Sequence, residues 1–284
     1  MSRLCFTPLY RYCRYRLGLA RSRVINYFDS CWDPGARMFY AGLVEKGFNQ
    51  LAYIDVLPRH RILYLCIPKC ASTTIRMALS TLIRQTPALS LPEQVHLRRF
   101  SGLKSPKQVG PSTFHRLVSD PTALRFSFVR NPYDRLVSAW ADKFQGKPLV
   151  AGDPTIETYL KHCRMIDHPL PKDADRTLSF ADFVHFAAAT ADRRVDAHWQ
   201  LQDDLLDIPG IGFDFIGKVE SFGQDFVRVM EHVGADHVGA EAINAHFNKS
   251  QRHSWRDYYT SALAQQAYRA YERDFDRLLY PRAV

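Results

Sequence analysis

Two polar turns, each following a short apolar run, contain the side chains best suited to binding an anion. In RILYLCIPKCASTTIRMAL, four such residues lie between an apolar run and an amphipathic stretch: Lys69, Ser72, Thr73 and Thr74. At such a place backbone N–H groups and a helix dipole attract an anion, and one lysine can reach it. The turn contains no glycine and lacks the G-x-x-x-x-G-K-[ST] spacing, so it is not a Walker A loop. A plain polar connection with a capping Ser or Thr has the same appearance.

The second turn has a cation where a nucleotide triphosphatase would have a metal-binding aspartate. In RFSFVRNPYDRLVSAWADKF the apolar run ends at Arg130, and Ser138 follows eight residues later on the expected helix. An arginine and a hydroxyl that converge can bind a phosphate without a metal. We interpret Asp134 and Arg135 as charges on the helix surface. The two turns together predict a ligand with phosphates at both ends, and adenosine 3′-phosphate 5′-phosphosulfate is such a molecule.

Several stretches of the chain carry a resemblance to a known family. The IPKCASTT loop resembles the 5′-phosphosulfate loop of the Golgi carbohydrate sulfotransferases, and FSFVRNPYDRLVSAW resembles their 3′-phosphate motif. Four further stretches of this chain are similar to segments of the chondroitin 4-O- and HNK-1-type enzymes (sulfotransferase family 2). They are DAHWQLQ at 196–202, FDFIGKVESF at 213–222, NKSQR at 248–252 and YERDFDRLLY at 271–280. The resemblance covers about 60–280, in order and at similar spacing.

The resemblance implies an enzyme that moves a sulfuryl group from 3′-phosphoadenosine 5′-phosphosulfate to a hydroxyl of a carbohydrate, either a polysaccharide or a glycolipid. It assigns Lys69 to the sulfate and the bridging oxygen, and Arg130 and Ser138 to the 3′-phosphate. The loop residues expected at the 5′-phosphosulfate are Pro68, Lys69, Cys70, Ala71, Ser72, Thr73 and Thr74. Lys249 and Arg252 are further candidates for contacts with the nucleotide, or surface charges. No metal is expected.

The acceptor hydroxyl needs a general base, most naturally His or Glu. Related sulfotransferases keep the base between the two nucleotide motifs, which leaves His96, Glu93 and His115. We favour His96 and expect it on a strand, whereas His115 falls in an expected helix. His198 and Trp199 are expected at the acceptor, although His198 could instead hold a helix in place and a tryptophan is more often part of a core.

The elements that position these residues predict an α/β fold. Apolar runs at 61–67 and 124–129 and a short strand at 213–217 alternate with helices at 73–83, 132–145, 179–190, 221–234 and 255–279. Residues 146–178 are rich in Pro, Asp and Lys and are expected to form an extended loop. We therefore predict a P-loop-like three-layer sandwich with a central, mainly parallel sheet flanked by helices.

Charge is unevenly distributed along the chain. The sequence has 284 residues and a net charge of +9, and six arginines precede the first acidic residue, Asp29. This divides the chain into a basic N-terminal arm at 1–37 and a sulfotransferase domain at 38–284. The arm is either a loosely ordered segment or a peripheral contact with an anionic membrane surface. The remaining excess is ordinary for a globular domain and gives no support to a nucleic-acid partner.

The composition excludes several classes of protein. With 46% hydrophobic and 13% aromatic residues the chain is neither disordered nor fibrous, and no apolar run is long enough to span a membrane. The six cysteines form no C-x-x-C pair, so neither a zinc site nor a disulfide framework is expected. The Cys pair and membrane anchor of the eukaryotic relatives are missing. We therefore expect a bacterial, cytoplasmic enzyme that is peripheral on the membrane at most.

Two other functions remain open. A P-loop nucleotide kinase would depend on Mg²⁺ and would need an acidic residue where Arg130 stands. A non-catalytic protein that binds a nucleotide or an anionic glycan would tolerate loss of Lys69, which the transfer reaction requires. Neither the oligomeric state nor the sulfated ring position follows from the sequence.

Overall fold

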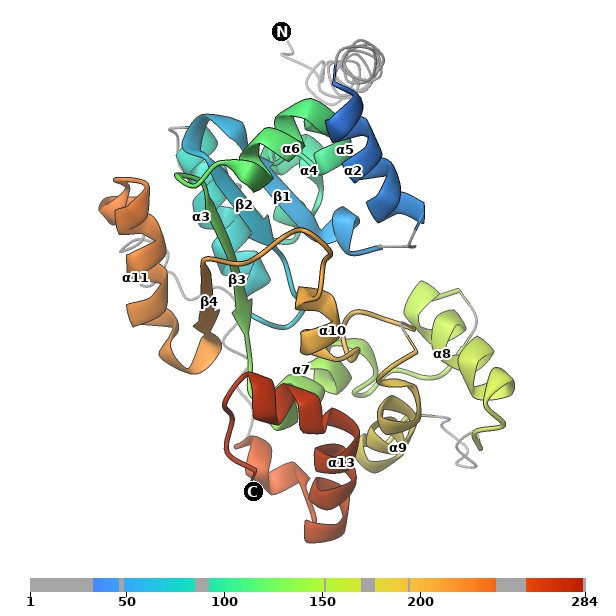
Figure 1. The fold of residues 1–284 in the computed structure, drawn as a ribbon. Helices are drawn as coiled ribbons and strands as arrows, with labels where there is room; N and C mark the ends of the chain where they lie inside the picture. Colours follow the sequence, from blue (N-terminus) through green and yellow to red (C-terminus); the bar gives the residue numbers. More distant parts are fainter. Residues whose placement is uncertain are drawn as a thin grey trace, which may run out of the picture. The chain divides into compact units, whose positions relative to one another are not determined.

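A computed structural model describes residues 33–45, 49–84, 92–150, 152–169, 177–193, 195–238 and 254–282 (Figure 1). These residues form two compact units, which we describe separately. Unit 1 comprises the described residues of 1–66, 71–128 and 208–249, and unit 2 those of 67–70, 129–207 and 250–284. Most of the expected basic arm lies outside the described residues. The expected boundary at residue 37 falls within a helix, α2 (Pro34–Glu45).

Unit 1 is built on a four-stranded sheet with the order β1-β2-β3-β4. β2 (Ile62–Leu65) pairs in parallel with β3 (Leu124–Val129), and β1 (Ile54–Leu57) runs antiparallel to β2 at one edge. Every residue of β1 and β2 is buried, as expected in a sheet that is covered on both faces. β2 is a continuous apolar run, whereas β1 includes the buried Asp55. The predicted α/β class with a mainly parallel sheet flanked by helices is confirmed.

In unit 1, α2 precedes the first strand and the other α-helices lie between or after the strands. The element after β2 is α3 (Ser72–Arg84), followed by the one-turn helices η3 (Pro92–His96), α4 (Arg98–Ser101) and α5 (Pro106–Val109) and then by α6 (Pro111–Ser119). Two further short turns, η1 (Asn49–Tyr53) and η2 (Pro58–His60), flank β1. Figure 1 shows α2 lying along α6, a contact that the coordinates confirm. The prediction of a strand around His96 is wrong, because this residue ends η3.

The last strand, β4 (Phe215–Lys218), packs closely against β3. A Cβ atom added to Gly217 would lie 2.5 Å from the ring of Phe128, so only glycine fits at this position. Asp214 also binds Arg125 through the backbone N–H and the guanidinium, which fixes β4 beside β3. The turn η4 (Val219–Ser221) leads into α11 (Phe222–His232), which contacts β4.

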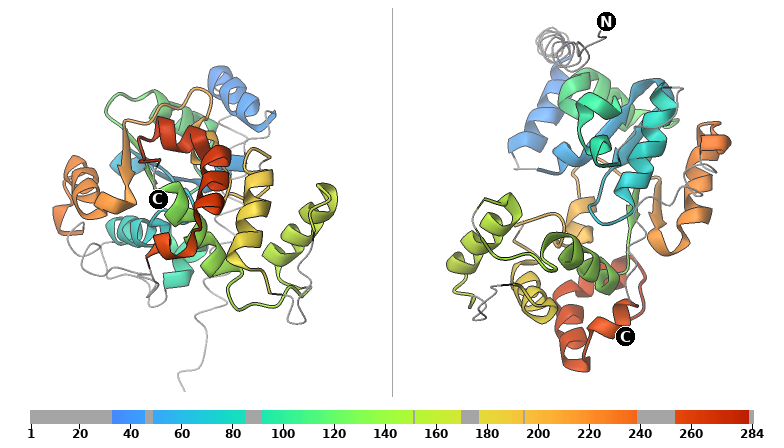
Figure 2. Two further views of the ribbon diagram at one scale, coloured as in Figure 1. Left: turned by 90° about the horizontal axis from the view of Figure 1, so that it is seen from below. Right: turned by 180° about the vertical axis from the view of Figure 1, so that it is seen from behind.

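Unit 2 is helical and begins with α7 (Pro132–Lys143), α8 (Pro154–Met165) and α9 (Phe180–Thr190). α10 (Gln202–Leu206), η5 (Trp255–Tyr258) and α13 (Ser261–Arg277) complete it, and α13 packs beside α9 (Figure 2). Its core is aromatic, and the rings of Phe144, Phe183 and Phe186 surround Trp199.

Two predicted elements of unit 2 are corrected. The expected loop at 146–178 contains α8, whose first turn is capped by the Asp153 carboxylate; the Asp-Pro pair that reads as a loop signal starts a helix here. The helix expected at 255–279 is divided into η5 and α13, because the Thr260 side chain caps a new helix. Ser179 caps α9 as predicted.

Candidate active site

The loop after β2 has an unusual backbone. Lys69 has φ of 69° and Ala71 has φ of 57°, both in the left-handed region that non-glycine residues avoid. The intervening Cys70 is fully buried, and its backbone N–H donates to the carbonyl of Ile67 at 3.3 Å. Strain of this kind is kept where the surrounding structure needs a particular geometry, and it often marks a functional loop.

In unit 2 the Lys69 ammonium lies against the C-terminal end of α7. Its Nζ is 3.3 Å from Oδ2 of Asp142, and Lys143 contacts the same oxygen at 3.3 Å. Burial lowers the pKa of Lys69, and the charge of Asp142 opposes that effect. Burial acts to raise the pKa of Asp142, but the charges of Lys69 and Lys143 lower it on balance. Lys69 is therefore held as a partly desolvated cation beside a carboxylate.

Arg130 lies against the N-terminal end of the same helix. Its Nε donates to Oδ2 of Asp134 at 2.7 Å, and its Nη1 donates to the carbonyl oxygen of Lys69 at 3.1 Å. The side-chain amide of Gln202 binds both the N–H and the C=O of Arg130, each at 2.9 Å. The carboxylate of Asp274 in turn accepts from the backbone N–H of Gln202 at 3.0 Å. A buried network therefore fixes both the backbone and the guanidinium of Arg130.

One face of α7 connects the two cations. Asp134, Ser138 and Asp142 are spaced by four residues, so they share a side of the helix. Arg130 pairs with the first of these residues and Lys69 with the last. Unit 2 thus brings together Lys69, Arg130 and Ser138, the three residues that the sequence placed at the two ends of a nucleotide.

The expectation that Asp134 and Arg135 are both surface charges is wrong for Arg135. Arg135 is only 2% exposed. Its guanidinium donates to three backbone carbonyls, those of Pro68 at 3.2 Å, Gln200 at 2.7 Å and Ala197 at 2.5 Å. The sequence offers a weak signal for this role, because Arg135 is followed by the apolar residues Leu136 and Val137, which also face the interior. Arg135 thus joins the lysine loop to the segment that precedes α10.

That segment contains His198 and Trp199, both expected to contact the acceptor. Nδ1 of His198 lies 2.6 Å from Oδ1 of Asp196, and about a quarter of the His198 side chain is exposed. Trp199 has no exposed surface and packs among Phe144, Phe183 and Phe186. Trp199 is therefore a core residue, and the expectation that it binds a sugar ring is wrong.

In unit 1 the first turn of α3 is linked to His96. Oγ1 of Thr73 lies 3.0 Å from Nε2 of His96, and Nη1 of Arg76 lies 3.2 Å from Nδ1 of the same ring. Arg76 is itself held by a 2.6 Å ion pair with the fully buried Asp55, which also pairs with Arg98. The turn that carries Ser72, Thr73 and Thr74 is thus supported by a chain of side chains that ends in a buried carboxylate.

The contacts of His96 assign its tautomer. A guanidinium can only donate, so Nδ1 of His96 must accept from Arg76. The neutral ring then carries its proton on Nε2, which donates to Thr73. The single lone pair of the imidazole is occupied, which disfavours proton abstraction by His96 in this arrangement.

The remaining sequence candidates lie elsewhere. His115 is on α6, as predicted, and its ring packs against Phe39 at 5.1 Å between centroids. Lys249 and Arg252 lie outside the described residues. In unit 1 Arg98 is paired with Asp55 and donates to the carbonyls of Ala52 and Ile54.

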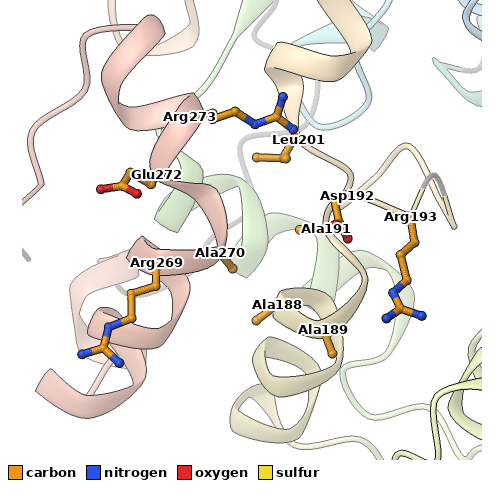
Figure 3. Close-up of a pocket in the computed structure, with 10 residues that line it drawn as sticks. All are labelled: Ala188, Ala189, Ala191, Asp192, Arg193, Leu201, Arg269, Ala270, Glu272 and Arg273. Atoms are coloured by element: carbon orange, nitrogen blue, oxygen red, sulfur yellow. The ribbon is translucent and has the colours of Figure 1, made fainter.

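Unit 2 also has a shallow cavity of about 470 Å³ between α9 and α13 (Figure 3). Its walls carry the side chains of Arg193, Arg269 and Arg273, together with Asp192 and Glu272. None of the residues predicted to bind a nucleotide lines it. This cavity is therefore not the predicted anion site.

The described residues contain neither a cluster of metal ligands nor a helix that could span a membrane. Within the described ranges, no three His, Cys, Asp or Glu side chains are grouped so that they could hold a metal ion. Among the helices that the structure describes, none has both the length and the apolar character needed to cross a membrane.

Comparison with known proteins gives one family. A family model described as "Sulfotransferase family" matches residues 52–281. The chain is 27% identical over 261 residues to carbohydrate sulfotransferase 12 of Mus musculus, covering 82% of this chain and 61% of that protein. It is 26% identical over 240 residues to carbohydrate sulfotransferase 10 of Xenopus laevis, covering 78% of this chain and 65% of the relative.

A human relative gives the same result. Carbohydrate sulfotransferase 14 of Homo sapiens is 26% identical over 238 residues, covering 81% of this chain and 61% of the human protein. The chain spans 61–65% of the length of these three relatives. No solved structure matches.

Proposed function

Because this chain belongs to the sulfotransferase family, we propose that it transfers a sulfuryl group from 3′-phosphoadenosine 5′-phosphosulfate to a hydroxyl of a carbohydrate. The observation that carries the proposal is the arrangement on α7. Lys69 and Arg130 are held at opposite ends of one helix face, with Ser138 between the residues that bind them. Two fixed cations on one helix face suit a ligand with an anionic group at each end.

Each cation has a role in this reaction. As the bond between sulfur and the bridging oxygen breaks, negative charge develops on that oxygen, and Lys69 stabilises it. Arg130 and Ser138 bind the 3′-phosphate and so fix the donor's position. Their carboxylate partners keep both cations in place, and an incoming anion competes with Asp134 and Asp142 for them.

The loop and the first turn of α3 complete the proposed donor contacts. We assign the 5′-phosphate to Ser72, Thr73 and Thr74 and to the N–H groups of the preceding loop. In unit 1 the Thr73 hydroxyl accepts from His96, which leaves its own proton to donate to an anion. Lys249 and Arg252 stay proposals for further nucleotide contacts.

The direct test is a transfer assay with donor that carries labelled sulfate, against desulfated polysaccharides and glycolipids. We expect label in the glycan and release of adenosine 3′,5′-bisphosphate. A chain that binds the bisphosphate without ever releasing it from the donor would instead support the non-catalytic binding protein. Phosphate transfer from a nucleoside triphosphate with Mg²⁺ would support the kinase, although Arg130 at the end of β3 favours sulfuryl transfer.

The acceptor and the cellular setting belong to the same proposal. We propose a polysaccharide or glycolipid acceptor and a bacterial, cytoplasmic enzyme whose arginine-rich arm contacts the inner face of the membrane. The support is the charge of the arm, six arginines before the first acid. Co-sedimentation with anionic vesicles tests it, and a chain without residues 1–32 should lose binding while retaining transfer.

A further inference from the structure

Asp196 and His198 form a hydrogen-bonded pair in unit 2. Oδ1 of Asp196 accepts from Nδ1 of His198 at 2.6 Å and from the backbone N–H of His198 at 2.8 Å. An ionised carboxylate can only accept, so Nδ1 carries the ring proton. Nε2 of the neutral imidazole therefore has the lone pair. Asp196 fixes the tautomer that a general base requires, whereas Arg76 fixes the opposite tautomer in His96.

The guanidinium of Arg135 anchors both this Asp196–His198 pair and the lysine loop. Arg135 donates to the carbonyl of Pro68, the residue before Lys69, and to that of Ala197, the residue before His198. Because all these residues belong to unit 2, Arg135 fixes the backbone next to His198 and the backbone next to Lys69 relative to each other.

The charge of Lys143 acts both on Asp196 and on Asp142, the carboxylate that holds Lys69. Its Nζ lies 3.3 Å from Asp142, the carboxylate that also holds Lys69. Burial acts to raise the pKa of Asp196, but the hydrogen bond and charge of His198 and the charge of Lys143 lower it on balance. Asp196 is therefore kept ionised.

We propose that His198 is the general base of the transfer reaction and that Asp196 is its positioning residue; this rests on the proposed function. Nε2 of His198 takes the proton of the acceptor hydroxyl. The oxygen then forms a bond to sulfur, while the bond from sulfur to the bridging oxygen breaks. The electron pair leaves with adenosine 3′,5′-bisphosphate, and Lys69 stabilises that charge. His198 thereby has a role that the sequence assigned to His96 or His115.

The first test compares matched glutamine variants of four histidines, using release of adenosine 3′,5′-bisphosphate in the presence of pooled desulfated polysaccharides. His198→Gln should lower kcat by about 10²–10⁴-fold, the usual contribution of a general base. Binding of adenosine 3′,5′-bisphosphate, measured by calorimetry, should stay within a few-fold. His185→Gln, on the exposed side of α9 in the same unit, should leave both unchanged.

The second test concerns Asp196 and uses a readout that a purely structural role would not move. Asp196→Asn should lower kcat by more than tenfold and weaken the preference of His198 for protonation on Nδ1, because an amide can either donate to or accept from that nitrogen. ¹⁵N NMR of the unliganded wild-type chain should show His198 protonated on Nδ1 at neutral pH. Thermal unfolding of each variant confirms that it is folded.

These outcomes separate the two proposals. A wild-type chain that neither binds the bisphosphate nor releases it from the donor overturns the proposed function. If the wild type is active, a His198→Gln variant that keeps more than a tenth of the wild-type kcat overturns the assignment of His198 as the base. Protonation of the wild-type His198 on Nε2 at neutral pH overturns it as well. Loss of kcat in His96→Gln or His115→Gln with an active His198→Gln would place the base in unit 1.

Discussion

At the scale of the residue, the two cations of unit 2 are held in different ways. The backbone of Arg130 is fixed by Gln202 and its guanidinium by Asp134, so little movement is needed to bind a phosphate. The backbone carbonyl of Lys69 accepts from Arg130, but its side chain is held by Asp142 at the ammonium, the end of a long chain. In the proposed reaction the Lys69 side chain follows the charge that moves onto the bridging oxygen, whereas Arg130 anchors the donor.

The first prediction concerns Lys69→Ala. It should lower kcat by about 10²–10³-fold, the cost of removing one donor that stabilises transition-state charge. Binding of adenosine 3′,5′-bisphosphate, which lacks the sulfate, should weaken only a few-fold. Rapid-quench kinetics with labelled donor and calorimetry measure the two quantities. The control is Lys161→Ala on the exposed side of α8, and equal activity of both variants would contradict the role of Lys69.

Arg135→Lys tests a residue that acts by positioning. Lysine retains the charge but cannot reach three carbonyls, so buried acceptors lose their donors. The free energy of unfolding should fall by about 2–4 kcal/mol, as expected when buried polar groups are left unsatisfied. Urea unfolding followed by tryptophan fluorescence measures it, with exposed Arg164→Lys as the control. Identical unfolding midpoints would show that the three hydrogen bonds do not matter.

At the scale of the element, α7 organises the site because of how it begins. Oδ1 of Asn131 accepts from the backbone N–H groups of Tyr133 and Asp134, and Pro132 occupies the first helical position. The cap fixes the first turn of α7 and hence where the face with Ser138 points within unit 2.

Asn131→Ala should therefore lower stability by about 1 kcal/mol through loss of the cap. Asn131→Asp should retain most of the wild-type stability, because a carboxylate accepts the same hydrogen bonds and suits the helix dipole. Thermal unfolding midpoints of the two variants provide the measurement. The cap has no such role if the aspartate variant is as unstable as the alanine variant.

At the scale of the whole molecule, the net charge of +9 is a poor guide to the site. Within unit 2 the cations at the candidate site are matched by carboxylates: Asp134 beside Arg130, and Asp142 between Lys69 and Lys143. We therefore expect the binding of a nucleotide with an anionic group at each end to depend on these local pairs and to weaken with added salt through screening.

Adenosine 3′,5′-bisphosphate should stabilise the chain by mass action, by about 2.7 kcal/mol at a concentration of 100 Kd. Arg130→Ala should abolish most of the rise in the unfolding midpoint. Arg228→Ala, whose side chain is 68% exposed on α11, should keep it. Thermal scans at low and high salt measure the effect. A rise that is equal in both variants would place the nucleotide away from Arg130.

The sequence alone determined most of the elements around the candidate site and the residues proposed to bind anions. Short buried strands and the helix caps are local signals, so β2, β3 and the start of α7 follow from apolar runs and from Asn131-Pro132. A lysine and an arginine after consecutive parallel strands are also visible in the sequence. α8 was missed because its Asp-Pro start reads equally well as a loop.

Only the tertiary structure decided what the side chains do. Arg135 reads as a surface charge until carbonyls distant in sequence converge on its guanidinium. The sequence favours His96 as the base and places His198 at the acceptor. The structure distinguishes them by whether a guanidinium or a carboxylate contacts Nδ1. Such partners come from long-range contacts, which spacing along the chain does not encode. Residue types therefore define the chemistry available, and the fold selects the tautomer and the charge state that use it.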